Sequence, residues 1–149
     1  MRGEGGSTVI GVRLDRSFAL YRDLVPILDE GVLAARLGDL PSNAVGAQIW
    51  CVVGARESYA RAIAAGEWSG FSCSLNEPGD PAQVGIALDR SAAALATVVA
   101  SMQECTAGQE GLLLDLLEHE VQHHGQLIRY LYGLRLPIPA SWKSRYALD

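Results

Sequence analysis

The chain has 149 residues, of which 49% are apolar and 19% are charged. That length suits one domain, which can bury a core without disulfides, and the high apolar fraction excludes a disordered chain. A net charge of −5 argues against nucleic acid as a partner, because such proteins need a concentrated basic face. No apolar run reaches the roughly 18–20 residues of a membrane span, so no membrane partner is expected.

The cysteines are Cys51, Cys73 and Cys105. An odd number of scattered cysteines is not a disulfide framework, and it favours a reducing, cytoplasmic location. A single domain over residues 1–149 is expected, with residues 1–12 as a loose N-terminal segment.

The first two helical segments are marked by apolar periodicity and by their end signals. The first runs from about Leu14 to Leu28, and Pro26 is expected to kink or stop it. After a short connector, the second begins near the capping residues Ser42 and Asn43 and ends at Gly66.

Two further helices follow a loop at residues 67–79, whose Trp68 and Phe71 are expected to cover one end of the fold. Asp80 and Pro81 begin the third helix, and the fourth covers about residues 110–132, after a loop at 106–109. Strand alternation is not apparent. Four helices with short connections predict an all-α fold of the four-helix-bundle type.

All three histidines lie within six residues of the fourth helix, at His119, His123 and His124. His119 and His123 are four residues apart, so they share one helical face and can bind one metal ion with a third ligand from elsewhere. Glu120 projects toward the apolar side. The alternative is a buried polar cluster without metal, in which Glu120 pairs with a histidine or with Arg56.

Residues 119–123 also match the pattern H-E-x-x-H of zinc metalloproteases. In that pattern the glutamate is a general base. No histidine or glutamate follows His124 to supply the usual downstream third ligand, and no sheet is predicted to hold a peptide. A protease is therefore disfavoured.

The stretch from His119 to Leu127 resembles the fourth-helix signature of the DinB-like (DinB/YfiT) family, in which two histidines four residues apart are followed by Gly-Gln. Residues 132–139 resemble the turn that follows it, and residues 48–57 resemble the family's second helix. The resemblance implies an up-down-down-up four-helix bundle, often a homodimer, with zinc or nickel held by one histidine of the second helix and two of the fourth.

Carried over residue by residue, the resemblance makes His119 and His123 metal ligands. Cys51 stands where the family has its second-helix histidine. A thiolate binds zinc well, so Cys51 is the candidate third ligand, although loss of the metal or a small buried side chain is the alternative. Cys73 is a second candidate from the loop, and Cys105 is expected to be inert.

The resemblance implies a metal-dependent thiol S-transferase, in detoxification, acting on a small-molecule substrate with a low-molecular-weight thiol. Glu120 is the candidate catalytic base or an outer partner of the ligands. The alternative is a non-catalytic helical-bundle protein with a degenerate metal site, which binds a partner or an apolar ligand or acts in a stress response. A third interpretation is a metal or redox sensor, in which Cys51 is oxidised.

Overall fold

The computed structural model describes residues 6–149, and within this range the protein is all-helical, with no strand. The all-α prediction is thus confirmed. The elements in chain order are α1 (Gly6–Leu24), η1 (Val25–Ile27), α2 (Glu30–Ala34), α3 (Val45–Ala65), α4 (Pro81–Ser101), α5 (Ala107–Gly133) and α6 (Ala140–Tyr146).

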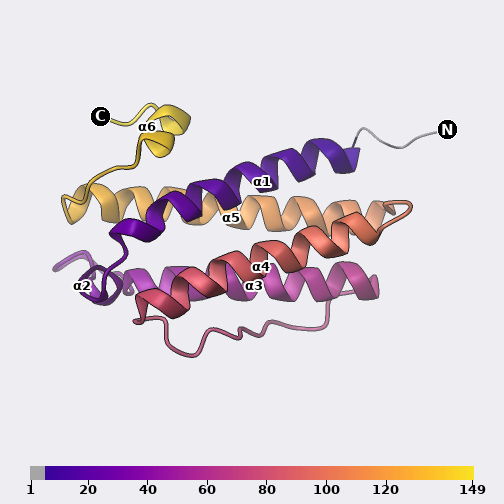
Figure 1. The fold of residues 1–149 in the computed structure, drawn as a ribbon, viewed down its shortest axis with the longest axis horizontal. Coiled ribbons are helices and arrows are strands. Elements are labelled where there is room, and N and C mark those ends of the chain that lie inside the picture. Colours follow the sequence, from indigo (N-terminus) through magenta and orange to yellow (C-terminus); the bar gives the residue numbers. More distant parts are fainter. Residues whose placement is uncertain (1–5) are drawn as a thin grey trace.

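The four long helices α1, α3, α4 and α5 lie side by side (Figure 1). Helix α3 packs against α4 and α5, and α1 packs against the same two helices. Helices α3 and α4 run in one direction, while α1 and α5 run in the other. Because α3 and α4 are parallel, residues 66–80 return along the whole length of α3 (Figure 1); we call this segment the strap.

Two of the predicted helix ends are confirmed. The Asp80 side chain accepts hydrogen bonds from the backbone of Ala82 and Gln83, and Pro81 follows at the first turn of α4. Gly66 closes α3 in the left-handed conformation, with φ of 81°, and its N–H donates to the Ala62 carbonyl.

The N-terminal half of the chain differs from the prediction in two places. Helix α1 begins at Gly6, so the segment expected to be loose is helical from that residue, while residues 1–5 lie outside the described range. The helix also ends at Leu24 and not near Leu28, because Pro26 falls in the tighter turn η1. Proline lacks the N–H that would continue the α-helical ladder.

The expected caps of the second long helix have other partners. Helix α3 starts one residue later, after Ala44, which makes no side-chain cap. The Ser42 hydroxyl accepts from the Leu37 N–H, and the Asn43 side chain accepts from Gln48. The fourth long helix begins earlier than predicted, because Thr106 and Gln109 form a reciprocal capping box.

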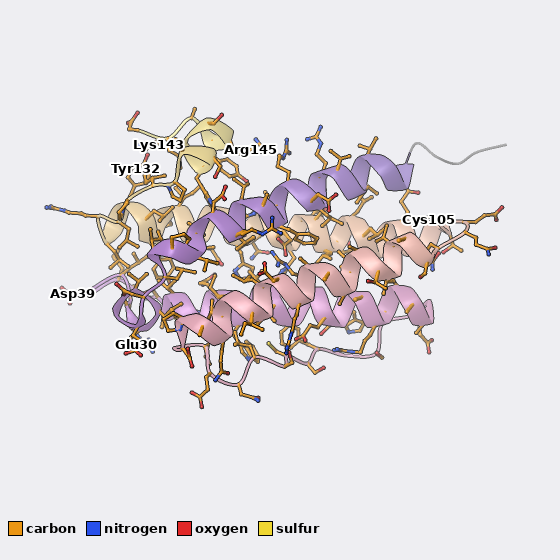
Figure 2. The ribbon with its side chains drawn as sticks, viewed as in Figure 1. Glu30, Asp39, Cys105, Tyr132, Lys143 and Arg145 are labelled. Atoms are coloured by element: carbon orange, nitrogen blue, oxygen red, sulfur yellow. The ribbon has the colours of Figure 1, made fainter. Side chains whose placement is uncertain are left out.

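A layer of buried polar side chains divides the core into two apolar clusters. All four long helices contribute side chains to this layer, among them Ser17, Arg56, Ser91 and Glu120. Figure 2 shows the side chains that fill the space between the four helices. Because buried polar groups need partners, this layer restricts which helices lie next to one another.

The strap lies along α3 and does not cover an end of the fold, contrary to expectation. Phe71 packs on Trp50 with ring centroids 5.2 Å apart, and Trp68 packs on Tyr59 at 5.0 Å. Gly54 allows this approach, because a Cβ at that position would overlap the Phe71 ring.

Helix α6 is held on α1 and α5 by aromatic side chains. Trp142 is fully buried, and its indole N–H donates to the Leu20 carbonyl over 2.7 Å. The Tyr146 hydroxyl lies 2.6 Å from Nδ1 of His124. The C-terminal segment is thus anchored to α1 through Leu20 and to α5 through His124.

Among the described residues, helix α4 is long and apolar enough to cross a membrane, by length and composition alone. The sequence analysis expected no apolar segment long enough to span a membrane, and helix α4 differs from that expectation. Helices of this length and composition also occur in the cores of soluble proteins. Helix α4 packs against α1 and α3, and 28% of its apolar stretch is buried inside the structure.

Candidate metal centre

Three side chains that can bind a metal ion meet where α3 packs against α5. Cys51 comes from α3, and His119 and His123 come from successive turns of α5. Their candidate ligand atoms all lie within 4.8 Å of one another. Cys51 Sγ lies 3.6 Å from Nε2 of His119, and the two imidazole centroids are 4.5 Å apart. The cluster predicted from the sequence could therefore hold a metal ion.

Gln48 fixes the orientation and the tautomer of His123. Its carboxamide oxygen lies 2.6 Å from Nδ1 of His123, and its amide nitrogen donates to Asn43 Oδ1 over 2.7 Å. The oxygen of Gln48 can only accept, so the hydrogen-bond network assigns the proton to Nδ1 of His123. The lone pair on Nε2 of His123 is then free for a metal.

Sequence reasoning missed Gln48 as a functional residue. It lies three residues before Cys51, one helical turn away on the same face. That spacing is the signal that could have found it, once Cys51 was taken as a ligand. His119 differs from His123, because its buried Nδ1 has no hydrogen-bond partner among residues 6–149.

The electrostatics of the site favour neutral imidazoles. Burial lowers the pKa of His119, and burial together with His119 lowers the pKa of His123 to about 4. Both rings are therefore neutral at pH 7 and keep the lone pairs that a metal needs. Burial raises the pKa of the Cys51 thiol, so metal binding at neutral pH has to release its proton.

Glu120 faces the polar layer of the core and is held there by two helices. Its Oε1 accepts from Arg56 Nε at 2.6 Å, and its Oε2 accepts from Arg56 Nη2 at 3.1 Å and from the Ser17 hydroxyl at 2.5 Å. Both carboxylate oxygens thus have partners within the core. This pairing with Arg56 is the alternative that the sequence left open, and a catalytic role for Glu120 stays a prediction.

The charge of Arg56 is satisfied on every side. Besides Glu120, its guanidinium donates to the Leu88 carbonyl at 3.1 Å, and it lies 4.4 Å from the centre of the Phe18 ring. A buried cation needs such a complete set of partners. Arg56 therefore connects α3 to α1, α4 and α5.

His124 points away from the metal cluster. Its Nε2 lies 2.9 Å from the Ser17 hydroxyl, and its Nδ1 lies beside Tyr146. Successive helical residues differ in direction by about 100°, so His124 faces α1 and α6 while His123 faces α3.

The two other cysteines lie outside the three-residue cluster. Cys73 in the strap donates its thiol hydrogen to the Trp50 carbonyl, with an S–O distance of 3.3 Å. Cys105 lies at the turn between α4 and α5, at one end of the molecule (Figure 2), and contacts the carbonyl of Thr106.

The donor set consists of two imidazole nitrogens and one sulfur. Zinc usually takes four ligands of these types, and a site with three protein ligands leaves a position for water or substrate. Comparison of the chain with protein-family models, with curated proteins and with solved structures finds no match.

Proposed function

We propose that this protein binds a zinc or nickel ion through Cys51, His119 and His123 and uses it as a metal-dependent enzyme of the DinB-like type. The observation that carries the proposal is the convergence of the three donors within 4.8 Å across two helices. Gln48 adds to it, because it holds His123 in the tautomer that a metal ligand requires.

The helical arrangement supports the family part of this proposal. The DinB-like fold is an up-down-down-up four-helix bundle, and here α3 and α4 run opposite to α1 and α5 (Figure 1). Each long helix packs against two others in a closed order. We therefore interpret the fold as a four-helix bundle of this type, with a cytoplasmic homodimer as the expected form.

The reaction proposed is transfer of a low-molecular-weight thiol to a small electrophilic substrate. A divalent metal lowers the pKa of a thiol bound to it, so the thiol is a thiolate at neutral pH. The chain's own residues keep this site in order: Gln48 orients His123, while the pair of Arg56 and Glu120 fixes α3 against α5 one turn away.

Metal content of tag-free protein tests the site. We expect about one zinc or nickel per chain by elemental analysis, lost in His123→Ala and reduced in Cys51→Ala. The matched control is Cys105→Ala, which removes a thiol outside the cluster. Absence of stoichiometric metal in the parent protein, even after reconstitution, would contradict the proposal.

Activity is tested separately on metal-loaded protein. Small cellular thiols are mixed with electrophiles such as epoxides or α,β-unsaturated acids, and loss of free thiol is followed with time. We expect turnover that a chelator abolishes and that Cys105→Ala retains. Metal binding without any thiol transfer would support the metal site and contradict the proposed transferase activity.

The second candidate function is a non-catalytic helical protein that binds a partner or an apolar ligand. The observation that favours it is the complete pairing of Glu120 with Arg56 and Ser17, which leaves the expected catalytic base occupied. It predicts that a chelator leaves the melting temperature unchanged, whereas bound metal would raise it by mass action.

A further inference from the structure

We infer that Cys51 and Cys73 form a reversible disulfide when a peroxide oxidises the protein, and that this bond removes Cys51 from the metal cluster. The consequence for the metal rests on the proposed function, whereas the disulfide itself does not. The inference joins the strap to the site, since Cys73 comes from the strap and Cys51 from α3.

The first observation is the contact between Cys73 and the backbone beside Cys51. Cys73 Sγ lies 3.3 Å from the carbonyl oxygen of Trp50. That carbonyl belongs to the peptide group that leads into Cys51, and planar peptide geometry puts Cys73 Sγ within about 6 Å of the Cys51 Cα.

The second observation is independent of that hydrogen bond. A Cβ added at Gly54 would lie 2.9 Å from the Cβ of Cys73. Position 54 is three residues from Cys51, so the two positions are neighbours on the helix surface. Burial raises the pKa of the Cys73 thiol most, and Glu57 and then Cys51 add to that rise.

Cys51 lies between the strap and α5 on the surface of α3. At 100° per residue, Gln48 and Ala55 fall on the side of Cys51 that faces α5, and Gly54 and Ser58 fall on its other side. The Ser58 hydroxyl donates to the carbonyl of Ser72 in the strap and accepts from the Ser72 N–H. The Cys51 thiol therefore has His119 on one flank and Cys73 on the other.

We infer that movement of the strap and rotation of the two side chains bring the sulfurs of Cys51 and Cys73 together. Disulfides have Cα–Cα distances of about 4.4–6.8 Å, and rotation about χ1 lets each sulfur change its neighbour. Gly54 has no side chain to obstruct the strap. All three cysteines are free thiols in this structure, and Cys105 lies at the far turn between α4 and α5 (Figure 2).

The chemistry balances with a peroxide as the oxidant. One thiol attacks the O–O bond, becomes a sulfenic acid, and one water leaves in the case of hydrogen peroxide. The second thiol attacks the sulfenic sulfur, the S–S bond forms, and a second water leaves. The peroxide is reduced and the two thiols are oxidised. Cys51 then no longer supplies a thiolate, and two imidazoles alone hold the metal more weakly.

Peptide mapping of the metal-free protein tests the disulfide. After treatment with hydrogen peroxide and blocking of free thiols, we expect a linked peptide pair that contains Cys51 and Cys73 and that disappears on reduction. Cys105→Ser should retain the link and Cys73→Ser should lose it. No such link in the parent protein, or links only to Cys105 or between chains, would overturn the inference.

A second measurement uses the zinc-loaded protein. Zinc release is followed with a chromogenic chelator. In the parent protein it should increase as the disulfide forms, and zinc should bind again after reduction and dialysis against zinc. The Cys73→Ser variant should keep its zinc at the same peroxide dose. Equal release from both proteins would overturn the link to the metal. If the protein binds no zinc, the proposed function is wrong, and the peptide map still tests the disulfide independently.

Discussion

Arg56 and Glu120 form an ion pair inside the helical core, with Arg56 Nε and Glu120 Oε1 2.6 Å apart and side chains only 1% and 0% exposed. It lies in the polar layer between the two apolar clusters. The pair explains how a carboxylate stays buried beside a histidine cluster without being part of it.

Removing one member of this pair is expected to destabilise the fold strongly. Glu120→Ala leaves the Arg56 charge buried without its partner, which typically costs about 3–5 kcal/mol. The matched control is Asp89→Ala, which breaks the exposed pair of Arg22 and Asp89 and should cost at most about 1 kcal/mol. Urea unfolding measures both, and equal losses would contradict the prediction.

Gln48 is expected to control metal affinity without contacting the metal. Gln48→Leu removes the acceptor for Nδ1 of His123, and loss of such an outer partner typically lowers metal affinity about 10–100-fold. Gln48→Glu keeps an acceptor and should bind zinc about as well as the parent protein. Gln122→Leu, on the exposed face of α5, is the control. Competition titration with a zinc dye provides the readout.

The stability of the metal-free protein is expected to fall on acidification. Burial lowers the pKa of His124 to about 4, whereas an unfolded histidine titrates near about 6.5. Between these values the unfolded chain binds more protons, so the free energy of unfolding rises with pH from about 4 to about 6.5.

The measurement compares urea unfolding of the parent and of His124→Gln at about pH 7 and pH 5. The parent should lose more stability between the two conditions than the variant, because the variant lacks one of the groups that must gain a proton. A variant with the same pH dependence would show that His124 is not buried as a neutral ring.

Gly46 is expected to tolerate no side chain. A Cβ there would overlap the Pro78 carbonyl of the strap and lie 3.1 Å from the Leu33 carbonyl. Gly46→Ala should therefore lower the free energy of unfolding by about 1–3 kcal/mol, as overpacking does. Gly111→Ala, where a Cβ meets no atom within 4 Å, should instead stabilise helix α5 by about 0.5–1 kcal/mol. Thermal unfolding distinguishes them, and a harmless Gly46→Ala would be the contrary result.

Trp142 is expected to hold helix α6 in place. It is fully buried, and its indole N–H donates a hydrogen bond to the Leu20 carbonyl. Trp142→Ala should therefore lower the free energy of unfolding by about 3–5 kcal/mol. Trp68→Ala is the control for loss of an indole, because Trp68 is 48% exposed. Comparable losses in the two variants would show that α6 contributes little to the fold.

The sequence by itself determined the all-helical fold and the face on which His119 and His123 lie. Both follow from local rules: apolar period, the stop at Gly66, the start at Asp80 and Pro81, and the four-residue spacing of two side chains on a helix. Cys51 could be named as a third donor only through the resemblance of residues 48–57 to a family helix.

Tertiary structure decided what each polar group meets. The choice of Arg56 as the partner of Glu120, the contact of Gln48 with His123 and the path of the strap beside Cys51 depend on which helices are neighbours and in which rotation. Those are long-range packing outcomes, set by complementary side-chain shapes and by the need to pair every buried charge. Local periodicity carries no information about them.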